Sequence, residues 1–174
     1  MFVYIALLRA VNVGGTGKLP MKDLVLMCEA LGFQQVKTYI ASGNVIFCSV
    51  HDAKKCQALL EDALANYAGK AVGIFIRTPQ ELQGLLDHNP FAHQAGNRSV
   101  CLFLDETPTA AMLETVKNKR DEELVCGERA LYIHYGEGMA ASKLMIPAAK
   151  SGTARNINTL TKLSEMAQRL QQEL

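Results

Sequence analysis

The sequence predicts an α+β fold of two ferredoxin-like (βαββαβ) subdomains with antiparallel sheets, the second of which is incomplete. Three observations predict it. The first 77 residues alternate apolar segments with amphipathic ones in the order strand, helix, strand, strand, helix, strand. A similar series begins again near residue 99. Of the 174 residues, 49% are hydrophobic, which is enough to form a core and excludes a disordered chain.

The first strand and the first helix have clear boundaries. Residues 2–8 are almost continuously apolar and rich in β-branched and aromatic side chains, which predicts a buried central strand. A glycine-rich loop follows. Pro20 stands at a helix start, where its missing N–H is tolerated, and the helix is expected to run to about Leu31. Gly32 then serves as its C-terminal cap.

A hairpin, a second helix and a fourth strand complete the first half. Strands are expected at 36–41 and 45–48, on either side of a tight turn. Asp52 can cap the second helix, which ends at Gly69. Residues 72–76 are the fourth strand, so the first half is expected to form a closed βαββαβ unit.

The second half repeats the pattern imperfectly. Segment 78–81 is a capping box that opens a linking helix. A strand at 99–105, a helix at 109–119 and a hairpin around 127–129 follow, and a last helix begins near Asn158. A second closing strand is missing from this series, so the second half is expected to be incomplete. The expected division is a first subdomain over 1–77, a linking helix and loop over 78–98, and a second subdomain with the C-terminal helix over 99–174.

Charge and composition narrow the classes of function. The 18 lysines and arginines nearly balance the 17 aspartates and glutamates, so no overall attraction to nucleic acid or an anionic membrane is expected. The longest apolar run, residues 1–8, is far shorter than the ~20 residues that span a bilayer. The five cysteines form no C-x-x-C pair and are expected to be buried thiols of a cytoplasmic protein. The four histidines lack metal-binding spacing, so no metal site is expected, and any other cofactor stays unknown.

The topology is expected to bring two polar loops together. In a sheet of strand order 4-1-3-2, strands one and two end at the same edge, so the loop after residue 8 and the turn at 42–44 meet there. Glycines let backbone N–H groups approach a ligand, a helix start favours an anion, and arginine and lysine add positive charge. The alternative is that these residues only shape the turns. The candidate ligand-binding residues here are Arg9, Asn12, Gly14, Gly15, Lys18, Ser42, Gly43 and Asn44, with Lys70 at the same end.

This region partly resembles two familiar modules, a P-loop and an RNA-recognition module. The glycine-rich loop approaches a P-loop, but Asn12 replaces its first glycine and Leu19 its serine or threonine, which excludes a Walker-type NTPase. The βαββαβ order is shared with RNA-recognition modules, in which Tyr4 would hold a base-stacking position. Asn44 and Ile46 stand where the third strand needs aromatic side chains, so nucleic acid is not favoured as a partner.

A second group of polar residues precedes the C-terminal helix. Asn158 or Thr159 is expected to cap that helix, which puts Arg155 and Asn156 beside its N-terminus, where an anion is favoured. Lys143 lies in the preceding loop. If the helix folds back across the first sheet, Lys143, Arg155 and Asn156 complete the same pocket. The alternative is an ordinary cap with exposed charges.

Several separated strings, in order, resemble one bacterial family, the domain of unknown function family 1697. They are LLRAVNVGG at 7–15, PM at 20–21, TYIASGNVIF at 38–47, NPF at 89–91, Gly138 with SKL at 142–144, and TARN at 153–156. The resemblance implies two ferredoxin-like halves, a cytosolic protein and no established activity. The motif positions that it implies are Arg9, Asn12, Gly14, Ser42, Gly43, Asn44, Lys143, Arg155 and Asn156.

Three positions depart from the pattern of that family. Ala10 stands where the family usually has glycine, and Ile157 where it often has tryptophan. Ala141 replaces a basic residue before the Ser-Lys pair, which weakens the expectation of a strongly cationic phosphate site.

Two hypotheses about function follow. The first is binding of, or catalysis on, a small anionic ligand, phosphorylated or nucleotide-like, in a pocket formed by the two loops and the segment 153–156. In it Arg9, Lys143 and Arg155 hold the anion. The alternative is a nucleic-acid-binding or protein-interaction module without catalysis. The sequence contains no recognisable nucleophile–base pair, so the catalytic residues and any reaction stay unknown.

Overall fold

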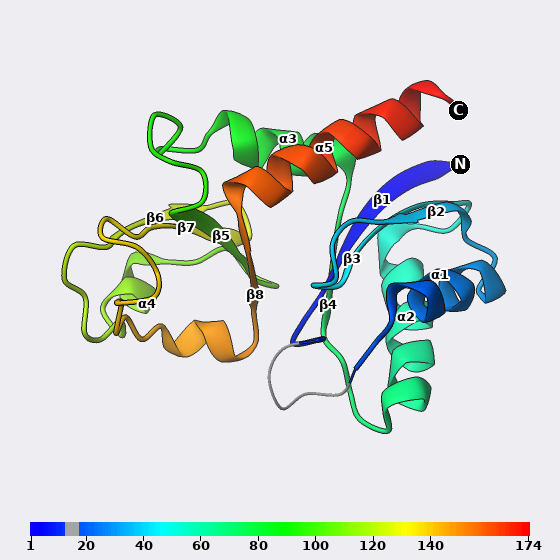
Figure 1. Ribbon diagram of the computed structural model, residues 1–174, viewed down its shortest axis with the longest axis horizontal. Helices are drawn as coiled ribbons and strands as arrows, with labels where there is room; N and C mark the ends of the chain where they lie inside the picture. The colour runs from blue at the N-terminus through cyan, green and yellow to red at the C-terminus, as the bar shows by residue number, and fades with distance from the viewer. Residues whose placement is uncertain (13–17) are drawn as a thin grey trace. The chain divides into compact units, whose positions relative to one another are not determined.

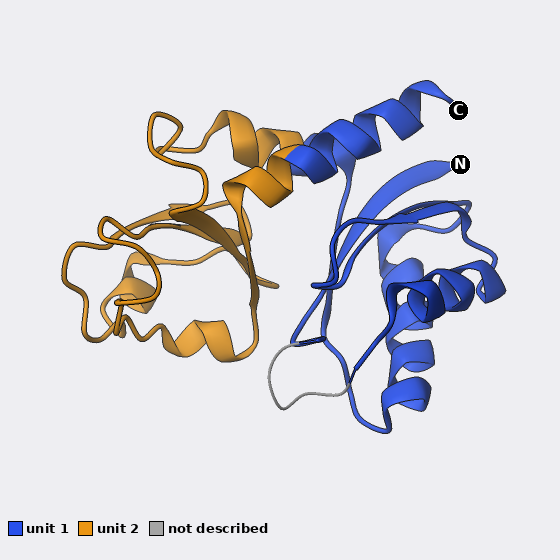
Figure 2. Ribbon diagram, in the orientation of Figure 1, with its two compact units in different colours: residues 1–82, 162–174 blue, residues 83–161 orange. Residues whose placement is uncertain are grey.

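A computed structural model describes the chain in two compact units (Figure 2). The described residues are 1–12 and 18–174. Unit 1 consists of residues 1–82 with 162–174, and unit 2 of residues 83–161. The division runs through two helices, α3 (Pro79–Asp87) and α5 (Ile157–Gln172), each of which begins in one unit and ends in the other. The subdomain boundaries expected near residues 77 and 98 stay predictions.

The sheet of unit 1 is antiparallel and has the strand order β2-β3-β1-β4. Its strands are β1 (Phe2–Leu8), β2 (Gln34–Thr38), β3 (Asn44–Ser49) and β4 (Ile74–Arg77). This order is the one predicted for the first half. It places the most apolar strand, β1, in the centre of the sheet, where both neighbours bond to its backbone.

The two helices that lie wholly within unit 1 pack on the same face of its sheet (Figure 1). They are α1 (Met21–Ala30) and α2 (Ala53–Ala68). The predicted caps are confirmed: the Asp52 carboxylate accepts a bond of 2.8 Å from the N–H of Lys55, and Gly69 ends α2 with φ 70°. Gly32 follows α1 with φ 85°, a conformation that favours glycine.

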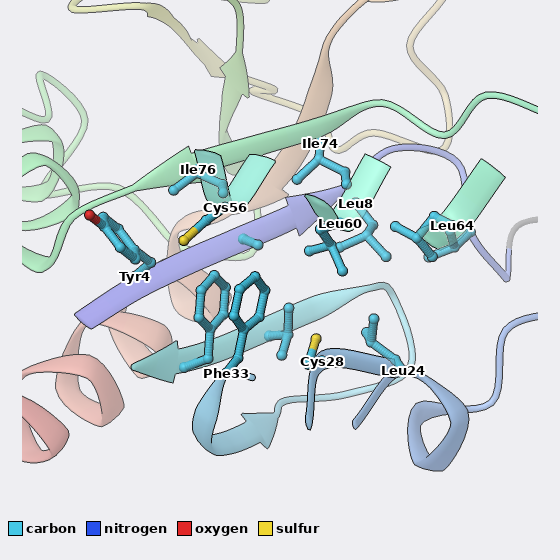
Figure 3. Close-up of a cluster of buried hydrophobic side chains, with 14 of the residues drawn as sticks. Tyr4, Leu8, Leu24, Cys28, Phe33, Cys56, Leu60, Leu64, Ile74 and Ile76 are labelled. Carbon is cyan, nitrogen blue, oxygen red and sulfur yellow. The ribbon is translucent and has the colours of Figure 1, made fainter. Parts of the chain in front are cut away.

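The core of unit 1 fills the space between the sheet and these helices (Figure 3). The rings of Phe33 and Phe47 stack at its centre, 4.3 Å apart and 7° from parallel. Burying each such side chain contributes roughly 1.5–3 kcal/mol, so this apolar face holds α1 and α2 in place. Cys28 lies in the same cluster, and burial raises the pKa of its thiol to about 12. The thiol therefore stays protonated at neutral pH and acts as a packing group.

Unit 2 has a second antiparallel sheet, of order β6-β7-β5-β8. Its strands are β5 (Ser99–Phe103), β6 (Glu123–Gly127), β7 (Ala130–His134) and β8 (Thr153–Asn156). The prediction of a missing closing strand is wrong, because β8 pairs with β5 as β4 pairs with β1. Segment 153–156 lacks an apolar run, and only its hydrogen bonds to β5 make it a strand.

Compared with unit 1, unit 2 has only short helical segments between its strands. The helix predicted at 109–119 is only α4 (Ala110–Leu113), and the second helix is replaced by a single 3₁₀ turn, η1 (Pro147–Lys150). The hydroxyl of Thr115 donates to the carbonyl of Met112 at 2.6 Å, which competes with continuation of the helix.

The C-terminal helix α5 begins earlier than predicted. The side-chain oxygen of Asn156 accepts a bond of 2.8 Å from the N–H of Thr159, so Asn156 is the cap, and the expectation of Asn158 or Thr159 is wrong. The capping box of α3 is confirmed in both directions, between Thr78 and Glu81 at 2.8 and 3.1 Å. None of the described helices combines the length and apolar composition needed to cross a bilayer.

Candidate functional site

Three connections meet at one end of the sheet of unit 1. The N–H of Leu8 donates to the carbonyl of Gly43, and the N–H of Arg9 donates to the carbonyl of Gly73, both at 2.8 Å. The end of β1 is thereby tied to the turn before β3 and to the segment before β4. The expectation that these loops lie at one end of the sheet is confirmed.

Gly43 allows the two loops to approach each other closely. Its φ of 83° lies in the region that favours glycine. A Cβ atom at this position would lie 2.5 Å from Cγ2 of Val11 and 2.9 Å from Cβ of Leu8. The packing of the first loop on the second therefore requires glycine here.

Asn12 links the two ends of the first loop. Its amide nitrogen donates to the carbonyls of Leu19 at 2.8 Å and Ala41 at 2.7 Å, and its amide oxygen accepts from the N–H of Leu19 at 2.7 Å. Both donors and one acceptor are thus used within the protein. Asn12 fixes Leu19 and the adjacent Lys18 relative to the second loop.

Asn44 connects the start of the second loop to its end through side-chain hydrogen bonds. The side chain is fully buried, and its amide nitrogen donates to the carbonyl of Tyr39 at 3.0 Å and to Oγ of Ser42 at 2.9 Å. Ile40, within this loop, is 52% exposed and has φ 50°, a costly conformation for a β-branched residue. The network around Asn44 holds the loop in this strained shape.

A pocket of about 210 Å³ opens beside the first loop, between it and the C-terminal end of α2. Its floor is made of core aliphatic residues, and two lysines lie among the more exposed residues around it. The lining residues are Ala10, Val11, Lys18, Leu19, Leu64, Tyr67, Ala68, Lys70 and Val72. The described lining thus carries positive charge and no carboxylate.

Tyr67 is held in place at the edge of this pocket. Its hydroxyl donates to the carboxylate of Asp23, on α1, at 2.8 Å. This hydrogen bond raises the pKa of Tyr67, so the hydroxyl stays protonated at neutral pH. One side of the pocket is therefore an aromatic ring whose hydroxyl is bonded to α1.

Three side chains of the described lining are titratable, namely Lys18, Lys70 and Tyr67, and the described lining includes no histidine, cysteine, serine or carboxylate. Lysine and tyrosine can bind an anion and can also transfer a proton, so this lining is compatible with binding and with acid–base chemistry. Nowhere in the described parts of the chain do three His, Cys, Asp or Glu side chains lie close enough to hold a metal ion.

The predicted site residues are distributed as follows. Arg9, Asn12, Ser42, Gly43 and Asn44 meet at the loop end of unit 1, and Lys18 lines the pocket beside them. Gly14 and Gly15 lie outside the described residues. Lys143, Arg155 and Asn156 belong to unit 2. The prediction that both groups share one pocket stays a prediction.

Sequence reasoning missed Tyr67, Leu64 and Val72 as lining residues. The spacing of Leu64 and Tyr67 on α2 was available, but it indicated only a core-facing helix stripe. Which end of that stripe stays uncovered depends on the packing of the loops against it, and no sequence motif marks this.

Of the predicted site residues in unit 2, Arg155 and Asn156 make hydrogen bonds within that unit. Arg155 is 8% exposed, and its guanidinium donates to Oγ1 of Thr153 at 2.7 Å and to the carbonyl of Ala154 at 2.9 Å. Burial lowers its pKa to about 10, so it remains charged at neutral pH. Asn156 caps α5, and Lys143 is exposed.

Tyr4 does not lie on an open face of the sheet. It is 4% exposed, packs in the helix-covered core near Phe47, and donates its hydroxyl to the carbonyl of His51 at 3.1 Å. A base cannot stack on a ring that the core covers. This position therefore offers no RNA-recognition platform.

These features define a class of protein: an α+β chain with two four-stranded antiparallel sheets of the same strand order and a lysine-lined pocket in the first unit. Residues 1–132 match the model of a family described as a protein of unknown function, DUF1697. The chain belongs to this family, and its function is not established.

A solved structure supports the fold. The chain is similar to the conserved bacterial protein SP0830 from Streptococcus pneumoniae, with 24% sequence identity and a TM-score of 0.77. The similarity covers 95% of this chain and 98% of that one. None of the curated proteins compared matches the chain.

Proposed function

We propose that unit 1 binds a small anionic ligand, phosphorylated or nucleotide-like, in the pocket beside the loop after β1. One observation carries the proposal: Lys18 and Lys70 both line this pocket, and every other described lining residue is uncharged. A lysine ammonium is a mobile point charge that binds phosphate and carboxylate groups well. Hydrogen bonds to charged groups contribute about 1.5–3 kcal/mol each.

The surrounding residues divide into ligand contacts and positioning residues. Lys18 and Lys70 hold the anion. Asn12, Gly43 and Asn44 keep the two loops in the shape that presents Lys18, and their side-chain or backbone bonds within the loops support this role. Arg9 and Ser42 stand at the same end of the sheet and are secondary contacts in this proposal.

Thermal unfolding in a phosphate-free buffer of low ionic strength tests the proposal. Inorganic phosphate, sulfate and adenosine monophosphate are titrated against the wild-type chain. A bound ligand at 100 times its Kd stabilises the folded state by about 2.7 kcal/mol, which is visible as a rise in Tm. We expect at least one of these anions to raise Tm in proportion to log concentration.

Lysine variants show where the anion binds. Lys18→Met and Lys70→Met remove the charge and keep the apolar stem, and each is expected to reduce the shift strongly. Lys54→Met is the matched control, because Lys54 is exposed at the opposite end of α2. Equal shifts in all three variants would show that the anion does not bind at this pocket and would overturn the proposal.

A further inference from the structure

The pocket of unit 1 has two chemically different parts. Val11, Leu19 and Leu64 are 5%, 3% and 1% exposed and belong to the hydrophobic core. The two lysines are exposed. A ligand in this pocket therefore meets aliphatic carbon on one side and ammonium groups on the other.

A small inorganic anion uses only the charged part. It does not fill the pocket of about 210 Å³ and does not contact the aliphatic residues that form its floor. A ligand with an apolar body removes its own carbon surface from water by packing against these residues. Each buried methylene then increases affinity about fourfold.

The apolar walls are also held in place before any ligand arrives. The backbone of Leu19 makes two hydrogen bonds with the side chain of Asn12. The hydroxyl of Tyr67 makes a hydrogen bond to Asp23. Val11 packs against the glycine at position 43. Walls that are already ordered lose little conformational entropy on binding, so more of the burial gain appears as affinity.

We infer, resting on the function proposed above, that the ligand of this pocket is an amphipathic anion: a single phosphate or carboxylate head joined to an aliphatic or aromatic body. The head lies at Lys18 and Lys70. The body lies against Val11, Leu19, Leu64 and the ring of Tyr67. Inorganic phosphate is the weaker ligand in this inference, because it has no apolar surface of its own to bury against these residues.

A homologous series measures the contribution of the body. Isothermal titration calorimetry compares inorganic phosphate with methyl, propyl, butyl and hexyl phosphate, and hexanoate tests the carboxylate head. We expect Kd to fall about fourfold per methylene until the chain fills the pocket. The heat capacity change of binding should become more negative along the series.

Variants separate the head from the body. Lys18→Met should weaken all alkyl phosphates by a similar factor. Ala68→Leu adds bulk at an exposed lining position and should remove the dependence on chain length while the lysines remain. Ala30→Leu is the matched control, because Ala30 is the exposed last residue of α1 and does not line the pocket.

The outcomes distinguish this inference from the function on which it rests. Equal affinity for inorganic phosphate and hexyl phosphate, lost in Lys18→Met, would overturn the amphipathic ligand and leave the anion site standing. Affinity that grows with chain length but ignores both lysine substitutions would overturn the anion site. Binding by no member of either series would overturn both.

Discussion

The two units share a backbone plan and differ in what covers it. In each, the first strand lies between the third and the fourth, and a backbone bond joins its end to the hairpin turn: Leu8 to Gly43 at 2.8 Å, and Leu104 to Arg129 at 3.0 Å. Unit 1 covers its sheet with helices of 10 and 16 residues, whereas α4 and η1 have four residues each. Of the two described apolar clusters, one on the helix-covered face of each sheet, the one in unit 1 is the larger. The same topology thus carries cores of different size.

The loop after the first strand differs as well. In unit 1 it borders the lysine-lined pocket. The corresponding loop of unit 2 borders an open hollow of about 450 Å³ whose lining includes Asp105 and Glu106 and no basic residue among those described. Equivalent places in the two sheets therefore have opposite charge. The fold fixes where a pocket forms, and the loop residues decide what it attracts.

The largest expected effect comes from the cores. Phe47→Ala should lower the free energy of unfolding by about 3–5 kcal/mol, because it removes a stacked ring from the larger cluster. Ile133→Ala, at the corresponding place in β7, should cost about 2–3 kcal/mol, because the side chain that it removes is smaller and belongs to the smaller apolar cluster. Urea denaturation together with hydrogen exchange in each unit measures both. An equal loss from both variants would contradict the difference in core size.

The hairpin turns offer the next comparison. Gly43→Ala should cost about 2–4 kcal/mol, because a Cβ there meets Val11 and Leu8 in a left-handed conformation. Arg129 has φ 52° at the corresponding turn, so Arg129→Gly should change stability by no more than ~1 kcal/mol. Chemical denaturation checks the pair. A tolerated Gly43→Ala would mean that the two loops of unit 1 do not pack closely.

Helix caps should show a smaller difference. Asp52→Ala removes the cap of a 16-residue helix and should cost about 1 kcal/mol. Thr109→Ala removes the cap of α4, which has four residues, and should cost ~0.5 kcal/mol or less. Thermal unfolding of both variants measures which loss of stability is larger, and Thr78→Ala, which removes the cap of α3, serves as a reference. A larger loss in Thr109→Ala would contradict it.

Alkaline pH should lower the stability of both units in the same way, and pH near neutrality should not change it. Burial raises the pKa of Cys28 in unit 1 and of Cys101 in unit 2 to about 12. Because the folded state holds these protons more tightly, their contribution is complete below the ordinary thiol pKa and is lost as pH rises through about 12. Cys28→Val and Cys101→Val should each flatten the fall in stability above about pH 9. If stability falls with pH in both variants as it does in the wild type, ionisation of these two thiols is not the cause of the fall.

The sequence predicted unit 1 well because its signals are local. The apolar run of β1, the cap at Asp52 and the glycines after α1 and α2 each act within a few residues of where they stand. The capping box after β4 is of the same kind. From these elements the strand order and the meeting of the two loops followed.

Unit 2 was predicted less well because its structure depends on distant partners. Thr153–Asn156 has a polar composition and becomes β8 only by pairing with β5. The predicted helix at 109–119 has suitable residues, yet only Met112 and Leu113 reach the core, and the helix ends there. Local preference alone did not decide either element.

The candidate site divides in the same way. The sequence alone identified the loop end of unit 1 and the charges of Lys18 and Lys70, since topology and residue type suffice for both. Only the tertiary structure decided that the amides of Asn12 and Asn44 are used to hold the loops, and that Leu64 and Tyr67 line a pocket. The physical reason is that hydrogen-bond partners and uncovered apolar surface depend on how separate segments pack, and no local stretch of sequence encodes that packing.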